Sequence, residues 1–554
     1  METYCNPLDL GYRYQHFHEN GKPRCDCREG ADPTLILFHG TYYLFVSMSA
    51  GFWYSEDLLN WKFHPAEDLQ IYDYAPDVRQ IGDWMVFSAS RRGVPSPILR
   101  TKDPLHQPFE QISAPFPFWD PDMFQDDDRR VYFYWGCSNT DPIYGVEMDP
   151  ETLTPIGEKK ALIFDHEEEL GYERPGDNGI VRPYIEGAFM TKRNGRYYLQ
   201  YACPGTQYNI YSDGVYTSDS PLGPFMRQKS NPFSSVPGGF ITGAGHGSTI
   251  ADKYGNYWHA ATMRISVNHL FERRVGLFPA GFDEEGTLYC NQNFADYPHR
   301  ILQAKFDTAA VQPVWMLLNY RKPVTASSSV AGSRPEQAVD EDIRTWWSAA
   351  GAEPGEWICS DLGRVSDVRA IQVNLADSGV QVEFPEEEYV EGRHIEVRPQ
   401  ISHYTLETSE NGTDWVQREQ VSRECSNGYF EYPEGIPARY VRLTGGKLPY
   451  GQPLRVSGLR VFGNGSGKKT DAAHVTSAKR KGPMDAAVAW TLVPGADGYN
   501  VLYGNAPDRL YHSWLVYDET AVDLCTLMAG EHYYVRVDAF NENGITEGTP
   551  AEIG

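Results

Sequence analysis

Gly40-Thr41-Tyr42-Tyr43-Leu44 joins a turn glycine to an aromatic-rich stretch, and similar segments return four times in the first half of the chain. These are Gly82-Asp83-Trp84-Met85-Val86, Arg130-Val131-Tyr132-Phe133-Tyr134, Gly195-Arg196-Tyr197-Tyr198-Leu199 and Gly255-Asn256-Tyr257-Trp258-His259. Their first residues lie 42, 48, 65 and 60 positions apart, which is typical of four-stranded propeller blades. Alternating apolar residues and Gly/Asp/Asn turns indicate strands rather than helices. The repeat predicts a five-bladed β-propeller over residues 1–300, with a β-sandwich of chance spacing as the alternative.

Length and charge narrow the class of protein. A chain of 554 residues is too long for one hydrophobic core and predicts several domains. The net charge of −26 argues against nucleic acid or an anionic membrane as partner, whereas a neutral glycan is indifferent to it. No run of eighteen apolar residues occurs, so no membrane span is expected. The start, Met1-Glu2-Thr3-Tyr4, lacks a signal peptide, so we expect a cytoplasmic bacterial protein as given, with an exported form left open.

The nine cysteines are scattered and odd in number, which fits free thiols in a reducing compartment. Cys25-x-Cys27 has no second pair at metal-ligand spacing, so ordinary thiols are expected there.

Four polar residues share one register relative to the repeated turns. Asp32 lies eight positions before Gly40, Asp120 ten before Arg130, and Glu186 and His246 each nine before their turn glycine. Each is therefore expected on the innermost strand of its blade, which lines the central channel of a propeller. Residues far apart in sequence would then share one small pocket. A turn or cap role is the alternative for these residues. The acidic runs are explained more simply, 126–128 as a hairpin turn and 167–169 as a solvated loop.

Residues 30–300 resemble glycoside hydrolase family 43. The resemblance rests on Ala31-Asp32-Pro33-Thr34, Asp120-Pro121-Asp122-Met123-Phe124, Glu186-Gly187-Ala188-Phe189-Met190 and His246-Gly247-Ser248. Ala188 stands where the family often has Pro, and Asp122 where a small residue is common. These departures concern the shape of the sugar subsite more than the chemistry.

The resemblance implies three catalytic roles. Asp32 would be the general base, Glu186 the general acid, and Asp120 the residue that orients Glu186 and raises its pKa. Single-displacement inversion needs a carboxylate to activate water on one face of the sugar and a carboxylic acid to protonate the leaving oxygen. No cofactor is required for this chemistry.

Several other residues are weaker candidates for the site. Asp77, Trp53 and Trp119 are candidate sugar contacts, with hairpin support or core packing as alternatives. Arg264 and Arg274 are expected to contact hydroxyls or pair with Asp32, or else to form structural ion pairs. His246 is a candidate ligand of a central ion or a core histidine.

Two further modules are expected after the propeller. Arg321–Ser329, Ala338–Trp347, Trp357–Gly363 and Arg439–Leu443 resemble a discoidin (coagulation-factor C-type) β-sandwich over residues 319–463, after a connecting segment at 301–318. A linker at 464–475 precedes residues 476–554, which resemble a fibronectin type III module. The fold class is thus all-β. Asp340 and Asp342 match a discoidin loop that often holds structural Ca²⁺, although Glu341 replaces its usual Gly.

The leading functional hypothesis is an exo-acting glycosidase that releases terminal arabinofuranose, galactofuranose or xylose from plant or microbial glycans. A retaining fructosidase-like enzyme is the nearest rival, but its Asn-Asp-Pro-Asn-Gly signature is absent. A non-catalytic glycan-binding propeller is the other rival. It would not need three carboxylates in register.

Overall fold

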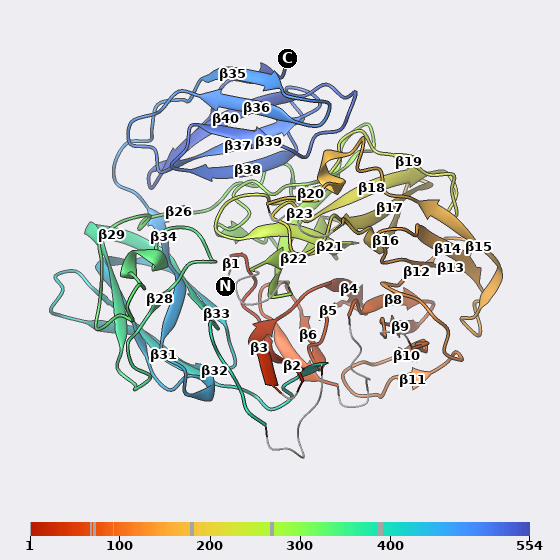
Figure 1. Cartoon of the computed structure of the whole chain (residues 1–554), viewed down its shortest axis with the longest axis horizontal. Helices are drawn as coiled ribbons and strands as arrows, with labels where there is room; N and C mark the ends of the chain where they lie inside the picture. Colours follow the sequence, from red (N-terminus) through yellow and green to blue (C-terminus); the bar gives the residue numbers. More distant parts are fainter. Residues whose placement is uncertain are drawn as a thin grey trace.

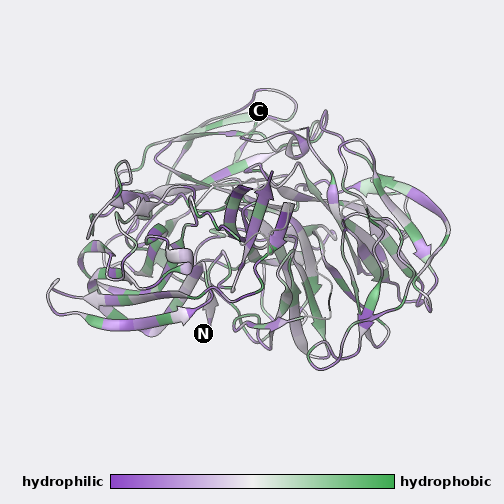
Figure 2. Ribbon diagram, turned by 60° about the horizontal axis from the view of Figure 1, so that its bottom comes forward, coloured by the Kyte–Doolittle hydropathy of each residue, from purple (hydrophilic) through white to green (hydrophobic). Residues whose placement is uncertain are grey.

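A computed structural model describes residues 2–20, 22–66, 69, 74–91, 94–177, 182–265, 271–384 and 392–554. The described chain consists of strands and three short 3-10 helices, at Gly171–Glu173, Pro335–Ala338 and Pro449–Gly451. None of the described helices is long and apolar enough to cross a membrane. Figure 1 shows three lobes: the propeller, a sandwich beside it, and a C-terminal sandwich against both. In Figure 2, apolar and polar segments lie side by side along the strands of the molecule.

Five antiparallel sheets form the propeller, four of them four-stranded and one five-stranded, and each is built from consecutive strands. The first two are β4 (Thr34–Phe38), β5 (Thr41–Phe45), β6 (Gly51–Ser55) and β7 (Lys62–Pro65), then β8 (Asp77–Ile81), β9 (Trp84–Ser88), β10 (Leu99–Thr101) and β11 (Glu110–Gln111). The third is β12 (Asp122–Gln125), β13 (Val131–Trp135), β14 (Ile143–Met148) and β15 (Pro155–Ile163). The fourth is β16 (Glu186–Arg193), β17 (Arg196–Cys203), β18 (Ser212–Ser218) and β19 (Met226–Arg227), with β20 (Ser234–Ser235) on β18. The fifth is β21 (Thr242–Ala251), β22 (Tyr257–Arg264), β23 (Arg273–Phe282) and β24 (Leu288–Cys290).

The predicted five-bladed propeller is confirmed. The five aromatic segments form the second strand of each blade, where their side chains pack between neighbouring sheets. The innermost strands β4, β8, β12, β16 and β21 contact one another in a closed ring.

Polar side chains near the start of the innermost strands join one blade to the next. Thr34 Oγ1 donates to the Pro76 carbonyl at 2.7 Å, and the backbone N–H of Met123 donates to Asp77 Oδ2 at 2.9 Å. The Met190 N–H likewise donates to Asp122 Oδ2 at 2.8 Å. Ser248 closes the ring, because its hydroxyl accepts from the Leu35 N–H at 2.8 Å. These buried bonds fix the spacing of the strands around the channel.

A hairpin precedes the first blade and pairs with the neighbouring domain. Its strands β2 (Arg13–Glu19) and β3 (Lys22–Glu29) form a three-stranded sheet with β30 (Gly392–Ile395). The start and end of the propeller also meet, since β1 (Thr3–Tyr4) pairs with β25 (His299–Arg300).

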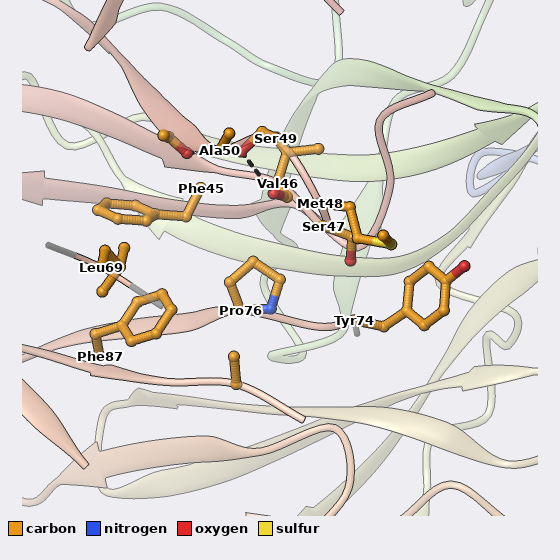
Figure 3. A pocket seen from close by; sticks show the side chains of 12 residues that line it. Phe45, Val46, Ser47, Met48, Ser49, Ala50, Leu69, Tyr74, Pro76 and Phe87 are labelled. Atoms are coloured by element: carbon orange, nitrogen blue, oxygen red, sulfur yellow. Dashed lines mark hydrogen bonds between the residues drawn. The ribbon is translucent and has the colours of Figure 1, made fainter. Parts of the chain in front are cut away.

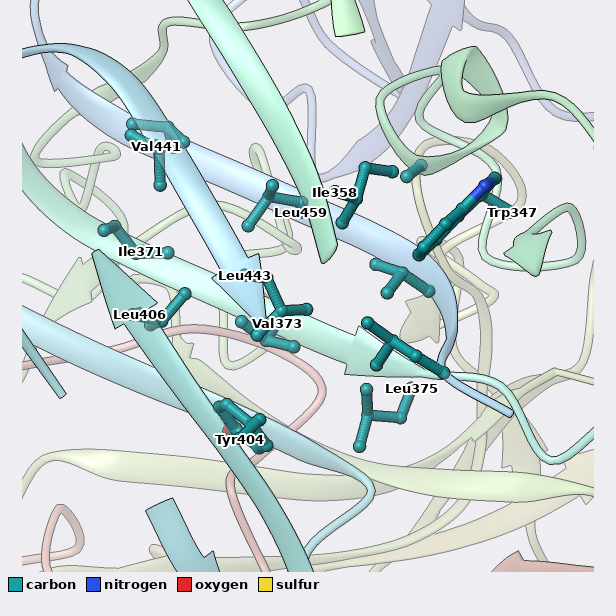
Figure 4. Packing of buried hydrophobic residues seen from close by; sticks show 14 of the residues in the cluster. Trp347, Ile358, Ile371, Val373, Leu375, Tyr404, Leu406, Val441, Leu443 and Leu459 are labelled. Carbon is teal, nitrogen blue, oxygen red and sulfur yellow. The ribbon is translucent and has the colours of Figure 1, made fainter. Parts of the chain in front are cut away.

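The second lobe is the predicted discoidin-like sandwich. Its strands are β26 (Met316–Leu317), β27 (Val324–Ala326), β28 (Trp347–Ser348), β29 (Trp357–Leu375), β31 (Ser402–Ser409), β32 (Val416–Arg423), β33 (Asn427–Gly445) and β34 (Arg455–Asn464). They enclose one apolar core, seen in Figure 4, in which Trp347 is fully buried between Ile358 and Leu375. The sandwich is thus a packed body with its own core.

The C-terminal lobe is a smaller two-sheet structure. One sheet holds β35 (Val475–Arg480), β36 (Ala486–Trp490) and β39 (Ala521–Leu524); the other holds β37 (Gly498–Gly504), β38 (His512–Tyr517), β40 (Tyr534–Asn541), β41 (Gly544–Thr546) and β42 (Ala551–Glu552). Trp490 and Tyr499 lie in the core between the sheets. The assignment of this sandwich to the fibronectin type III class stays a prediction, as do the domain boundaries drawn from the sequence.

Candidate active site

The four register residues meet at one end of the central channel. Asp32 and Asp120 each stand two positions before an innermost strand, Glu186 begins β16, and His246 lies within β21. The backbone is left-handed at three of these positions, with φ of 50° at Asp32, 46° at Asp120 and 47° at His246. Left-handed backbone is uncommon for residues other than glycine and concentrates at functional sites.

His246 lies between two of the carboxylates. Its Nδ1 is 3.5 Å from Asp32 Oδ1 and 3.9 Å from Asp120 Oδ2. Its backbone N–H donates to Asp213 Oδ1 at 2.7 Å, which fixes this part of β21. Burial lowers the pKa of His246, but Asp32, Asp120 and Glu186 outweigh that effect, and the pKa is raised above its usual value. The ring is therefore favoured as an imidazolium, and the site is a cation surrounded by carboxyl groups.

Asp32 is held as a carboxylate. Ser47 donates to its Oδ2 at 2.6 Å, and Arg273 NH1 donates to its Oδ1 at 3.3 Å. Burial raises the pKa of Asp32, but Arg273 and His246 pull it below the usual value. Ser47 also lines a small pocket between the first two blades, seen in Figure 3 with Pro76 and Tyr74. An ionised carboxylate fits the predicted base.

Asp120 and Glu186 form a second group with Cys137. One oxygen of each carboxyl and the Cys137 sulfur all lie within 4.8 Å of one another. The Cys137 thiol donates to Glu186 Oε2 at 3.3 Å, and the Tyr211 hydroxyl donates to Glu186 Oε1 at 2.5 Å. Burial, then the charges of Glu186 and Asp32, raise the pKa of Asp120 to about 7 against the lowering effect of His246. This group therefore exchanges a proton near neutral pH.

The residues predicted to contact the sugar have different surroundings in the structure. Trp53 is 2% exposed and packs against Phe63 in the core between blades, so the prediction that it stacks on sugar is wrong in this conformation. Trp119 is half-buried and directly precedes Asp120, so it stays a candidate. Asp77 accepts from the Met123 N–H and pairs with Arg79 at 3.7 Å. These contacts favour the supporting role for Asp77.

The predicted arginines point elsewhere. Arg264 binds Asp177 through two hydrogen bonds of 2.9 Å, and it holds the loop before β16 rather than the carboxylates. Arg274 donates to the Arg273 carbonyl at 2.8 Å and stacks over Tyr12. Its neighbour Arg273 pairs with Asp32 instead, because adjacent strand residues face opposite sides of the sheet.

Ion binding by the predicted ligands His246, Asp340 and Asp342 stays a prediction. Among the described residues, Asp120, Cys137 and Glu186 place donor atoms close enough together for an ion, and His246 does not belong to that group. In the discoidin-like loop, Asp340 accepts from Thr345 at 2.7 Å, and Asp342 accepts from its own neighbour Arg344. Arg344 thus pairs with Asp342 in this loop, and Ca²⁺ binding there stays a prediction.

Sequence reasoning missed Ser47, Cys137, Tyr211 and Arg273, and also Ser90, whose hydroxyl donates to Asp120 Oδ1 at 3.2 Å. Ser47 and Cys137 lie just beyond the ends of β5 and β13, and Arg273 begins β23. Such positions at strand ends, close to the channel residues Asp32, Asp120, Glu186 and His246, could have indicated them from the sequence. Tyr211 directly precedes β18 in the same way.

A five-bladed propeller with carboxyls at its channel mouth offers the side chains that a glycoside hydrolase needs. Residues 28–288 match the family described as Glycosyl hydrolases family 43, and residues 323–458 match the F5/8 type C domain. The chain therefore contains a family 43 glycoside hydrolase domain followed by a discoidin domain.

Two named relatives lie in this class. Beta-D-galactofuranosidase xynD of Aspergillus niger is 26% identical over 293 residues, covering 44% of this chain and 77% of that protein. Arabinoxylan arabinofuranohydrolase of Bacillus subtilis is 25% identical over 318 residues, covering 45% of this chain and 59% of that protein. Among solved structures, a thermostable family-43 glycoside hydrolase is 22% identical with a TM-score of 0.41, covering 56% of this chain and 98% of that chain.

Proposed function

We propose that the protein is an exo-acting, inverting glycosidase that releases a terminal furanose or pentose. The observation that carries the proposal is the convergence of Asp32, Asp120 and Glu186 on His246 at the channel mouth. Arabinofuranose and galactofuranose are the leading sugars, because the two named relatives are a galactofuranosidase and an arabinofuranohydrolase. Xylose is the third candidate.

Each group has a role that its surroundings favour. Asp32, ionised beside Arg273, activates the water. Glu186, with hydrogen bonds from Tyr211 and Cys137, protonates the leaving oxygen, and Asp120 orients it. The charges of both other carboxyls act on Asp120. The inverting mechanism requires Asp32 and Glu186 on opposite sides of the sugar.

The C-terminal sandwich is proposed to be a fibronectin type III module. Its support is the division into a three-stranded sheet and a larger one around a tryptophan core. The cytoplasmic location also stays a proposal.

The test measures turnover of a panel of nitrophenyl arabinofuranoside, galactofuranoside and xyloside. Asp32→Asn and Glu186→Gln are each expected to lower kcat about 10²–10⁴-fold on the preferred sugar. Glu168→Gln, a carboxylate 70% exposed outside the site, is the control and keeps full activity. NMR of the first product separates inversion from retention. Glycan binding without any turnover by the wild type overturns the enzyme in favour of a lectin.

A further inference from the structure

A strand of the discoidin domain completes the sheet that leads into the active site. β30 pairs with β2, with Arg393 opposite Phe17 and His394 opposite His16. β2 in turn pairs with β3, whose last residue, Glu29, stands three positions before Asp32. A short strand far away in sequence therefore borders the segment that carries the proposed base.

Four side chains of alternating charge link that strand to the site. Arg393 NH1 lies 3.2 Å from Glu29 Oε1, and Arg273 NH2 lies 2.8 Å from the same oxygen. Arg273 NH1 then reaches Asp32 Oδ1 at 3.3 Å. Glu29, Arg273 and Asp32 are 2%, 3% and 4% exposed, so solvent screens this ion-pair row (Arg393, Glu29, Arg273 and Asp32) only weakly.

An aromatic pair covers both guanidinium groups. Tyr74 and Phe271 stack with ring centroids 5.7 Å apart. Arg273 lies 5.1 Å from each ring, and Arg393 lies 5.6 Å from Tyr74 and 5.2 Å from Phe271. Arg393 also donates a hydrogen bond to the Tyr74 hydroxyl. The rings restrict both arginines to the geometry that the carboxylates require.

The discoidin domain is anchored to the same hairpin by a second, buried ion pair. Arg28 binds Asp377 through Nε at 2.9 Å and NH2 at 2.7 Å, with side chains 1% and 0% exposed. Tyr14 also donates to Asp377 Oδ1 at 2.8 Å. The hairpin and the discoidin domain therefore hold β30 in a defined register beside Glu29.

We propose that Arg393 is a positioning residue of the glycosidase: from the discoidin domain, it holds Asp32 of the propeller through Glu29 and Arg273. The inference rests on the proposed function, in which Asp32 is the base. It makes the discoidin domain a structural part of the active site and not only a module attached to it.

The physical effect of losing Arg393 follows from the charges. Glu29 would keep its buried charge with Arg273 as its remaining partner, and Arg273 would be drawn from Asp32. Among the described residues, the charged and titratable groups that interact with Asp32 are Arg273, His246, Asp120, Tyr74 and Tyr211. Those that interact with Glu29 are Arg273, Arg393, Tyr74 and Cys27. A less neutralised Glu29 makes Asp32 harder to ionise.

The experiment compares Arg393→Gln and Arg393→Lys in the full chain. Arg393→Gln is expected to move the acidic limb of the pH profile of kcat/KM upward by roughly half a unit to one unit, with kcat falling and KM changing less than about twofold. Arg393→Lys keeps the charge and is expected to recover most of the shift. Arg398→Gln is the matched control, because Arg398 binds Glu396 outside the row, and its profile stays that of the wild type.

A double variant tests the route. In a Glu29→Gln background, Arg393→Gln is expected to add little further loss, because the intermediate charge is gone. Additive losses, an unshifted limb in Arg393→Gln, or equal losses in Arg393→Gln and Arg398→Gln would overturn the proposal. The same four-variant cycle read in the free energy of unfolding reports the coupling of Arg393 to Glu29 without any assay. If Asp32→Asn keeps its turnover, the base assignment fails; if Asp32→Asn is inactive and Arg393→Gln is normal, only the positioning role fails.

Discussion

Asp32 and Asp120 occupy similar positions, but their neighbours shift their pKa values in opposite directions. Each precedes a proline at the start of an innermost strand, and both are buried. Burial raises the pKa of both, but Arg273 and His246 bring the pKa of Asp32 below its ordinary value, whereas Asp120 has no arginine partner among its main influences and Glu186 adds to the rise. Opposite shifts of this kind separate a base from a proton-holding carboxyl.

Asp120 should leave a signature in the pH dependence of stability. Its pKa is about 7 in the folded protein against 3.8 as the ordinary value, so between these pH values the folded state holds a proton that the unfolded state loses. Its contribution therefore falls as the pH rises through this window. Asp120→Asn removes this titrating group. The free energy of unfolding of the variant minus that of the wild type should therefore increase between pH 4 and pH 8 by on the order of a few kcal/mol. Denaturant unfolding at both pH values measures it, and an equal difference at the two contradicts the assignment.

Tyr211 offers a second test at this scale. Its hydroxyl donates to Glu186, which becomes charged as it gives its proton to the leaving oxygen, and a hydrogen bond to a charged group contributes about 1.5–3 kcal/mol. Tyr211→Phe should lower kcat about tenfold or more with little change in KM, as steady-state kinetics would measure. Tyr134→Phe, which removes a buried hydroxyl bonded to the Pro221 carbonyl in another blade, is the control. Equal effects of the two variants would mean a loss of packing only.

The sequence reached part of this site. The shared register located Asp32, Asp120, Glu186 and His246, because the period of the blades places equivalent residues around one axis. It did not separate Arg273 from Arg274, since which face of a strand looks into the channel depends on the blade's twist and neighbours. Trp53 was misplaced for a similar reason: an aromatic residue on a strand serves the core as well as it serves a ligand.

At the scale of elements, the start of β16 is the tightest point around the site. Gly187 has a φ of 60°, and a Cβ built there would lie 2.7 Å from His246 Cγ. The glycine thus lets β16 approach the imidazole that lies between the carboxylates.

Gly187→Ala should displace His246 and Glu186 and lower kcat more than tenfold, since the added carbon meets the imidazole ring. Gly195→Ala is the matched control, with a φ of 79° but no atom within 4 Å of the added carbon. Both variants carry a similar backbone penalty of about 1 kcal/mol. Activity measured at equal folded fraction separates the contact from the strain, and equal losses would count against the contact.

Some strands could be predicted from the sequence and others could not. The five repeated strands were predictable because each pairs with its neighbours in sequence. β30 was not, because a four-residue strand that pairs with β2 across more than half of the chain leaves no local period to detect.

At the scale of the molecule, the propeller and the discoidin domain share a buried polar contact. Arg28 and Asp377 are both nearly inaccessible to solvent, and removing one partner leaves the other as an uncompensated buried charge. The two domains should therefore unfold together.

Asp377→Asn is expected to lower the free energy of unfolding by about 3–5 kcal/mol. Asp361→Asn, which breaks a pair with Arg439 whose side chains are 24% and 39% exposed, should cost about 1 kcal/mol or less. Chemical denaturation followed by fluorescence measures both. A change in Asp377→Asn no larger than in Asp361→Asn would show that the contact does not join the domains.

Each blade consists of strands that follow one another in the chain, so no strand is shared between the first and fifth blades. The circle is thus a split ring, and contacts outside the blades' own ladders close its gap, among them the Ser248 hydroxyl on the Leu35 N–H and the backbone bond from the Gly30 N–H to the Arg273 carbonyl at 3.1 Å. Asp32 lies on the first blade at that gap and His246 on the fifth. Heat or denaturant that opens the gap is therefore expected to separate Asp32 from His246 first, so that catalytic activity is lost while the sheets of the blades are still folded.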